Sequence, residues 1–401
     1  MSELSYLEKL LDGVEVEWLP LSKVFNLRNG YTPSKTKKEF WANGDIPWFR
    51  MDDIRENGRI LGNSLQKISS CAVKGGKLFP ENSILISTSA TIGEHALITV
   101  PHLANQRFTC LALKESYADC FDIKFLFYYC FSLAEWCRKN TTMSSFASVD
   151  MDGFKKFLIP RPCPDNPEKS LAIQSEIVRI LDKFTALTAE LTAELNMRKK
   201  QYNYYRDQLL SFKEGEVEWK TLGTFADNFD SLRKPITSGL RETGNIPYYG
   251  ASGIVDYVKD YIFDDDLLLI SEDGANLIAR NTPIAFSISG KTWVNNHAHV
   301  LKFKNYTEQK FVEYYLNNIN LTPYISGAAQ PKLNKKNLES IRIPNPSLKE
   351  KERIVTILDK FDTLTNSITE GLPREIELRQ KQYEYYRDLL FSFPKPETVS
   401  N

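Results

Sequence analysis

The chain has 401 residues, with 51 Lys and Arg against 51 Asp and Glu, so its formal net charge is zero. At ~100–200 residues per domain, this length predicts two or three domains. Zero net charge excludes a polycation that grips nucleic acid by bulk charge, but it is compatible with a sequence reader that uses local basic patches. The longest apolar run, residues 125–131, is too short to span a membrane, and the N-terminus lacks the apolar core of a signal peptide. The 6 cysteines include no C-x-x-C pair, which predicts reduced thiols and a cytoplasmic protein.

In chain order, variable domains alternate with long helical segments. Strands at 83–87 and 267–270, with one helix in each variable domain at 124–137 and 308–317, predict an α+β fold. Residues 170–212 contain no Gly or Pro and carry apolar residues at alternating spacings of three and four, which predicts one long coiled-coil helix. A second segment carries the same apolar seam, but Gly371 and Pro373 should break or kink it.

The most informative feature is an internal duplication. Residues 177–184 (IVRILDKF) return as residues 354–361 (IVTILDKF). Residues 198–212 (RKKQYNYYRDQLLSF) return in the same order as residues 379–393 (RQKQYEYYRDLLFSF). The variable domains echo one another more faintly, for example GDIPW at 44–48 and GNIPY at 244–248. Each half of the chain is therefore one variable domain followed by one well-preserved helical segment.

The duplication also closes into a circle. A Leu-Leu pair leads into the tripeptide VEW near the N-terminus, at residues 16–18, and again in the middle, at residues 217–219. The termini should therefore meet, with a pseudo-two-fold axis and an antiparallel intramolecular coiled coil. The expected parts are an N-terminal helix that completes the second helical region (1–13), a first variable domain (14–160), a central helical spacer (161–213), a second variable domain (214–344), a C-terminal helical spacer (345–393) and a tail (394–401).

No catalytic motif stands out in the sequence. Neither half contains a P-loop or a G-x-G-x-x-G, and no Asn-Pro-Pro-aromatic motif is present to hold a flipped adenine. His297 and His299 would lie on one face of a strand and could form a metal pair. No third ligand is near them in the sequence, and the first half has Arg107 at the place of His297. A metal-dependent enzyme is therefore the weaker alternative.

Matched polar segments in the two variable domains favour DNA reading. Arg pairs with guanine, and Asn or Gln pairs with adenine, through two hydrogen bonds at the base edge. We expect Asn105 and Arg107 in the first domain, and Asn276 and Asn295 in the second, to face bases. Lysines and arginines outside these segments should hold phosphates. The candidate DNA-binding residues are Lys35, Arg50, Thr88, Ser89, Asn105, Gln106, Arg107, Arg233, Lys234, Tyr249, Glu272, Asp273, Asn276, Lys291, Asn295, Asn296, His297 and Lys332.

Several short motifs stand out across both variable domains: TPSK at 32–35, FW at 40–41, GDIPW at 44–48, TIG at 91–93, IPYYGASG at 246–253, EDGAN at 272–276 and WVNNHAH at 293–299. In these motifs the chain resembles the specificity subunits of type I restriction-modification enzymes, and the resemblance covers nearly the whole chain. The doubled tetrad Thr-Ala-Glu-Leu at 188–195 is similar to the short repeat of the type IC group. The second helical segment departs from that pattern, because it has Gly371-Leu372-Pro373 in place of the tetrad.

This resemblance implies a non-catalytic subunit that binds double-stranded DNA. Each variable domain would be a target-recognition domain that reads one half of a bipartite asymmetric site. The helical spacer would set the gap between the halves. Two modification subunits, carrying S-adenosylmethionine, would methylate adenine, and two restriction subunits would cleave DNA with ATP and magnesium. The resemblance implies no cofactor, metal or membrane contact for this chain. Two alternatives stay open at this point: a stand-alone metal-dependent enzyme using His297 and His299, and a coiled-coil scaffold that does not bind DNA.

Overall fold

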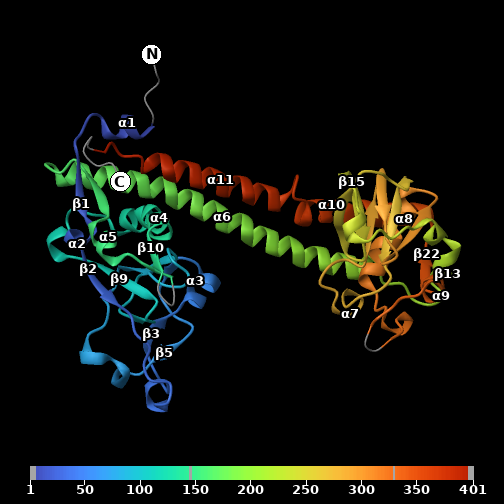
Figure 1. The fold of residues 1–401 in the computed structure, drawn as a ribbon, viewed down its shortest axis with the longest axis horizontal. Helices are drawn as coiled ribbons and strands as arrows, with labels where there is room; N and C mark the ends of the chain where they lie inside the picture. The colour runs from blue at the N-terminus through green and yellow to red at the C-terminus, as the bar shows by residue number, and fades with distance from the viewer. Residues whose placement is uncertain (1–5, 144–146, 328–329, 396–401) are drawn as a thin grey trace. The chain divides into compact units, whose positions relative to one another are not determined.

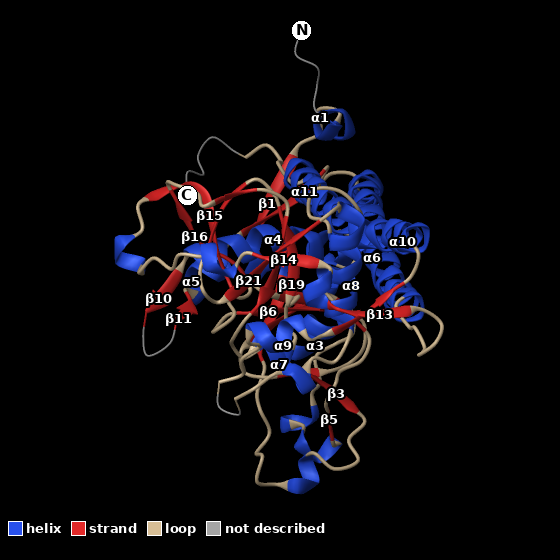
Figure 2. Ribbon diagram, turned by 90° about the vertical axis from the view of Figure 1, so that its right-hand side faces the viewer, coloured by secondary structure: helices blue, strands red, loops and turns tan. Residues whose placement is uncertain are grey.

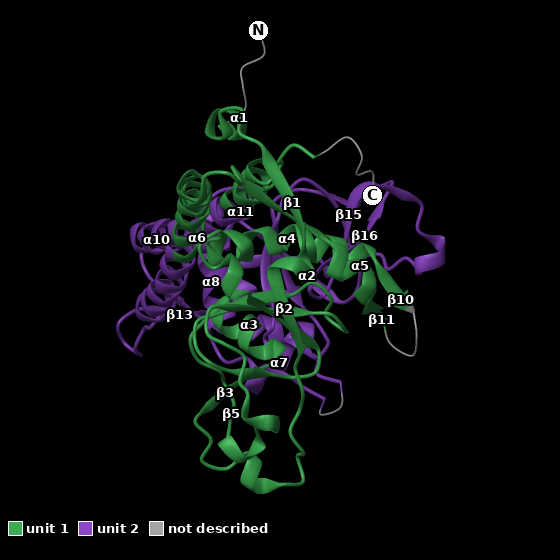
Figure 3. Cartoon of the chain, turned by 90° about the vertical axis from the view of Figure 1, so that its left-hand side faces the viewer, with its two compact units in different colours: residues 1–189, 378–401 green, residues 190–377 purple. Residues whose placement is uncertain are grey.

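The computed structural model describes residues 6–143, 147–327 and 330–395, and the chain divides into two compact units. Unit 1 contains Met1–Ala189 and Leu378–Asn401, and unit 2 contains Glu190–Glu377 (Figure 3). Both units mix helices with strands, which confirms the α+β prediction (Figure 2). Within the described part of the chain, no helix has both the length and the apolar character needed to span a membrane. All six cysteines are free thiols; three are buried, two are half-buried and Cys71 is exposed.

Unit 1 contains two main sheets that share one hydrophobic cluster, to which Trp48 and Phe108 belong. The larger sheet has the strand order β2 (Phe25–Asn29), β9 (Phe108–Leu113), β6 (Ser83–Ser87), β7 (His95–Ile98) and β4 (Ile60–Leu61). The smaller has the order β5 (Lys67–Ile68), β3 (Ile46–Phe49) and β8 (Leu103–Ala104). The other elements are α1 (Tyr6–Leu11), β1 (Val16–Pro20), α2 (Leu21–Val24), α3 (Met51–Asn57), α4 (Ile123–Lys139), β10 (Thr141–Met143), β11 (Ala147–Val149), α5 (Met151–Lys156) and β12 (Leu158–Pro162).

Unit 2 repeats this plan with two four-stranded sheets. The first has the order β14 (Ala226–Asn228), β21 (Ala298–Phe303), β18 (Leu267–Ser271) and β19 (Ala285–Ile288). The second has the order β16 (Gly253–Val258), β15 (Thr243–Gly250), β20 (Lys291–Val294) and β17 (Phe263–Asp264). The parallel pairing of β15 with β20 corresponds to that of β3 with β8 in unit 1. The other elements are β13 (Glu218–Thr221), α7 (Asn276–Ala279), α8 (Tyr306–Asn318), α9 (Lys335–Glu339) and β22 (Arg342–Asn345).

The helical segments follow the sequence prediction closely. Helix α6 (Pro167–Leu209) runs without interruption for 43 residues, and the second segment is divided into α10 (Leu348–Asn366) and α11 (Leu372–Leu390) (Figure 1). The predicted break is confirmed and lies at Gly371, which has a φ of +83°. A Cβ at this position would lie 2.3 Å from the carbonyl oxygen of Thr363, so the turn between the two helices requires glycine.

Within each unit, the two helical segments meet through equivalent aromatic contacts. In unit 1 the rings of Phe184 and Tyr386 stack with centroids 5.4 Å apart. In unit 2 the repeat-related Phe361 and Tyr205 stack at 5.7 Å. The early residue of each segment thus meets the late residue of the other, which is the pairing order of an antiparallel coiled coil.

The expected circular closure is present within unit 1. Leu11 of α1 belongs to the same buried cluster as Leu390 and Phe391 at the end of α11. The indole Nε1 of Trp18 donates a hydrogen bond to the carbonyl oxygen of Pro394, at 3.0 Å. The first strand of unit 1, β1, is therefore tied to the segment that follows the last helix of the chain.

An aspartate in each repeated IxxILDKF block fixes the helical segment to the variable domain of its own unit. Asp182 accepts a hydrogen bond from the Tyr128 hydroxyl of α4, at 2.7 Å. Its counterpart Asp359 accepts one from the Tyr314 hydroxyl of α8, at 2.6 Å. Burial, followed by the hydrogen bond to Asp359, raises the pKa of Tyr314, so this hydroxyl stays protonated and donates.

We predict that Asp359→Ala destabilises unit 2 by about 1–3 kcal/mol, because the buried Tyr314 hydroxyl loses its acceptor. The measurement is the urea dependence of unfolding of the full chain. Glu352→Ala is the matched control, because it removes an exposed carboxylate from the same helix. Equal unfolding midpoints for the two variants would show that the aspartate does not anchor the helix.

Candidate nucleic-acid interface

Each unit carries a short polar loop at the end of a strand that pairs in parallel with its neighbour. In unit 1 the loop follows β8, which pairs with β3, and in unit 2 it follows β20, which pairs with β15. We call residues 105–107 reading loop 1 and residues 295–297 reading loop 2. In loop 1 the backbone N–H of Arg107 donates to Oδ1 of Asn105 at 3.0 Å. In loop 2 the backbone N–H of His297 donates to Oδ1 of Asn295 at 2.8 Å. The two loops therefore have the same turn, built by the first asparagine of each.

This turn decides which side chains of the loop are available to a ligand. The amide oxygens of Asn105 and Asn295 are occupied by their own loops, and Asn295 is only 7% exposed. The second and third residues of each loop are exposed instead. Loop 1 presents Gln and Arg at these positions, and loop 2 presents Asn and His. Base reading by Asn105 and Asn295 stays a prediction, but the geometry favours their neighbours.

Reading loop 1 lines a basic groove of about 790 Å³, which we call the reading groove. It brings together three stretches that are distant in sequence and that were predicted separately, around Lys35, Arg50 and Arg107. Its basic residues are Lys35, Lys38, Arg50, Arg55 and Arg107, and its single acidic residue is Asp52. Amide side chains of Gln66 and Gln106 supply hydrogen-bonding groups between these charges.

Two side chains in the reading groove are placed for a ligand. The buried Nε of Arg50 has no hydrogen-bond partner among the described residues, and its Nη2 lies 3.5 Å from Asp52. The Gln106 amide oxygen accepts a hydrogen bond from the Thr32 hydroxyl, which fixes the amide at the groove wall. Thr88 adjoins the same loop, since its backbone N–H donates to the carbonyl oxygen of Arg107 at 2.9 Å. The half-buried Ser89 follows it in the chain.

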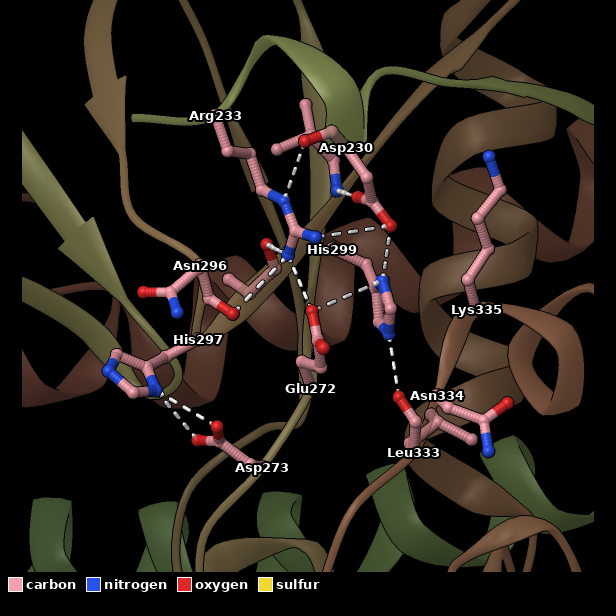
Figure 4. A network of polar contacts seen from close by, with 12 residues as sticks. Asp230, Arg233, Glu272, Asp273, Asn296, His297, His299, Leu333, Asn334 and Lys335 are labelled. Atoms are coloured by element: carbon pink, nitrogen blue, oxygen red, sulfur yellow. Dashed lines mark hydrogen bonds and ion pairs between the residues drawn. The ribbon is translucent and has the colours of Figure 1, made fainter. Parts of the chain in front are cut away.

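Below reading loop 2 lies a network of charged side chains that the sequence did not reveal (Figure 4). The Arg233 guanidinium binds Glu272 at 2.6 Å, lies 3.6 Å from Asp230, and donates to the carbonyl oxygen of Ala298 at 2.8 Å. Lys332 binds the other oxygen of Glu272 at 3.1 Å. The Arg233 side chain is only 13% exposed, so it supports the loop from within and is poorly placed to hold a phosphate.

His299 is part of this network and is buried. Its Nδ1 lies 2.6 Å from an Asp230 oxygen and its Nε2 lies 2.7 Å from the carbonyl oxygen of Leu333. Both neighbours are acceptor oxygens, so each ring nitrogen of His299 is paired within the network. Burial opposes the charge of Asp230, but the hydrogen bond and charge of His299 hold the pKa of that carboxyl below its usual value.

The prediction that His297 and His299 share one strand face is wrong. His297 lies in the turn before β21, and its Nδ1 binds Asp273 at 2.9 Å, away from the partners of His299. Potential ligand atoms of Asp230, Glu272 and His299 do lie within 4.8 Å of one another. Arg233 and Lys332 already neutralise these carboxylates, however, so the cluster is an ion-pair network rather than a vacant cage for a cation.

Unit 1 has an uncharged counterpart of this network. The Thr109 hydroxyl donates to Asn29 at 3.0 Å and lies 3.0 Å from the Thr88 hydroxyl, at positions that correspond to His299, Asp230 and Glu272. The link from the network to the loop is nevertheless the same. The backbone N–H of Glu272 donates to the carbonyl oxygen of His297 at 2.9 Å, as that of Thr88 does to Arg107.

The remaining candidates in unit 2 are placed differently from one another. Both polar atoms of the Asn276 amide are used by the backbone of Thr282, at 3.0 and 3.1 Å. Lys291 is at the far end of β20 from reading loop 2, with its ammonium 4.7 Å from the ring centre of Tyr261. Tyr249 and the exposed Lys234 lie beside the loop, since their backbones bond Asn295 and Val294.

The groove residues that the site prediction missed include Arg55 and Gln66. Helix α3 and the pairing of β3 with β5 bring them to the groove. No spacing rule connects them to reading loop 1, so only the tertiary structure could identify them.

Comparisons with known proteins agree with this arrangement. The family described as "Type I restriction modification DNA specificity domain" matches twice, over residues 13–198 and 214–378. The Type I restriction enzyme EcoprrI specificity subunit of Escherichia coli is 70% identical over 380 residues, covering 92% of this chain and 93% of that protein. The Type I restriction enzyme EcoR124I/EcoR124II specificity subunit of Escherichia coli is 43% identical, with 100% of both chains covered.

A solved structure supports the fold at greater distance. The S subunit of a type I restriction-modification system from M. genitalium aligns over 96% of this chain and 98% of its own, with a TM-score of 0.56 and 18% identity. The doubled domain match and the whole-length relatives agree with the duplicated units and their paired reading loops. The chain therefore belongs to the family of type I restriction-modification DNA specificity subunits.

Proposed function

We propose that this chain is the DNA-reading subunit of a type I restriction-modification complex, and that each unit reads one half of a bipartite, asymmetric site. The observation that carries this proposal is the pair of reading loops. They share one turn but present Gln106 and Arg107 in unit 1, and Asn296 and His297 in unit 2. Equal geometry with different side chains suits two readers of different sequences.

The side chains at the loops suggest how each half is read. Arg107 can donate two hydrogen bonds to a guanine edge, and Asn296 can pair with an adenine edge. The reading groove of unit 1 is basic, so it can hold the phosphates that flank the bases. In unit 2, Asp273 fixes the imidazole of His297, which leaves Nε2 of that ring for a base or phosphate.

The proposed partners follow from the duplication and the family. Recognition domains at 14–160 and 214–344 would alternate with helical regions at 161–213 and 345–393. Because the helical motif occurs twice, two modification subunits would dock on the helical spacer and methylate adenine with S-adenosylmethionine. Two restriction subunits would add ATP- and magnesium-dependent cleavage. The chain itself would contribute recognition without catalysis, in the cytoplasm.

The two alternatives have less support. A metal-dependent enzyme would need His297 and His299 to meet at one ion, but they have separate carboxylate partners. A scaffold that does not bind DNA gives no reason for a groove lined by five basic residues and one acidic residue.

Exchange of a whole recognition domain tests the two-reader arrangement. We predict that replacing residues 14–160 by the first domain of another family member changes one half of the methylated motif only. The other half should persist, because unit 2 has its own sheets and its own loop. Methylated adenines are mapped in cells that carry the complete system, and a change in both halves would refute separate reading.

Arg107 tests the contact itself. Arg107→Ala should weaken binding to the cognate duplex by about 1–3 kcal/mol and relax one position of the unit 1 half-site. The measurement compares binding of the assembled complex to duplexes that differ at single positions. Lys156→Ala, an exposed change at the end of α5, is the control and should leave binding unaltered. An equal loss on every sequence would identify Arg107 as a phosphate contact instead.

The tetrad at residues 188–195 tests the spacer. One added Thr-Ala-Glu-Leu unit lengthens a helix by ~6 Å, at ~1.5 Å per residue. Since a base pair rises ~3.4 Å, the added length corresponds to about one or two base pairs. A third unit after Leu195 should therefore lengthen the unread gap by about that much and leave both half-sites unchanged. Motif mapping again provides the measurement. A gap of unchanged length would show that this stretch of α6 does not set it.

A further inference from the structure

A second basic groove, of about 540 Å³, lies next to the reading groove in unit 1. Met51 and Arg55 of α3 line both grooves, so the two are continuous across this helix. The second groove has three arginines against the single acidic residue Glu94. Arg55 lies in α3, Arg59 in the turn between α3 and β4, and Arg138 in α4. None of its lining residues was among the predicted DNA contacts.

The charges of this second basic groove are only partly neutralised. Arg59 is engaged, since it binds Glu94 at 2.8 Å and donates to the carbonyl oxygen of His95 at 3.0 Å. Arg55 and Arg138 are exposed and make no hydrogen bond or ion pair with the part of the chain that the structure describes. Both guanidinium groups therefore face the groove without a directly bonded carboxylate, although the charge of Arg138 also acts on Glu135.

A neighbouring glycine explains how Arg138 reaches this position. Gly93 has a φ of +89°, and a Cβ there would lie 2.7 Å from Nη1 of Arg138 and 2.8 Å from the carbonyl oxygen of Ala134. The guanidinium thus occupies the space that any larger residue at 93 would fill. Gly93 is the last residue of the TIG motif at 91–93. Contacts with bases did not explain this motif, whereas the position of Arg138 does.

The positive charges of the second basic groove also act on His95, which is buried. Burial, and then the charge of Arg59, lower the pKa of His95 to about 3, and Arg138 contributes in the same direction. The imidazole is therefore neutral and adds no cation that would compete with the arginines.

We propose that the second basic groove binds a phosphodiester of the DNA backbone, through Arg55 and Arg138, beside the bases read by unit 1. This inference rests on the proposed function. A phosphate is favoured because two of the three arginines have no bonded carboxylate, so the groove offers positive charge to an anion. Its other polar lining residues are Thr91 and Glu94, and it has no Asn or Gln like those that line the reading groove. Phosphate contacts of this kind fix the register of a protein on the duplex without reading sequence.

The test measures the salt dependence of binding by the full chain, assembled with its modification subunits, to the cognate duplex. Each phosphate contact contributes about −0.9 to the slope of log K against log salt concentration. Arg138→Gln should reduce the steepness of that slope by about 0.9, with the sequence preference unchanged. Arg55→Gln should reduce the slope by a similar amount. Lys139→Gln is the matched control, because it removes a neighbouring charge that is paired with Glu135.

Single neutral methylphosphonate linkages, placed in turn along the duplex beside the unit 1 half-site, locate the contact. At one position the neutral linkage should weaken binding by the wild-type protein but not by Arg138→Gln. In the salt titration, Arg138→Lys should retain the wild-type slope if charge alone is needed. Slopes of both glutamine variants equal to wild type would overturn the inference, as would an altered methylated motif. If wild type itself shows no preference for the cognate duplex, the proposed function fails instead.

Discussion

The fold depends on one stacking contact that the chain makes twice. Phe184 packs on Tyr386, and the repeat-related Phe361 packs on Tyr205. Each contact joins segments that lie far apart in the sequence, so neither unit is complete until both helical segments are present. The hydrogen bond from Trp18 to Pro394 likewise joins two segments of unit 1 that lie at opposite ends of the sequence. A recognition domain can therefore vary in sequence while the surrounding helices keep their own packing.

This independence explains how two related domains come to present different surfaces. The reading loops share a turn, yet the side chains beneath them differ completely in charge. Loop 1 rests on the neutral Thr88 and Thr109, whereas loop 2 rests on ion pairs of Arg233 and Glu272. Both supports connect to the loop by the same backbone hydrogen bond, so the loop geometry survives when the chemistry below it changes. Duplication followed by divergence of side chains produces two readers from one framework.

The helical part of the structure could be predicted from the sequence, because apolar periodicity and Gly371 act locally. The strand at 83–87 was also found from its β-branched pattern. The site was predicted less well. Whether Arg233 meets a phosphate or Glu272 depends on burial, which no local pattern contains. The contribution of Arg55 likewise depends on how α3 packs beside reading loop 1, a contact between distant segments.

The most direct test of the central claim is a map of methylated adenines in a host that carries the complete system, compared with the same host lacking this chain. Two independent reading loops predict a single motif with two specified halves of different sequence, separated by a gap of fixed length in which any base is accepted. Methylation at that motif should disappear when the chain is absent. A continuous motif, two identical halves, or methylation that persists without the chain would contradict reading by two separate units.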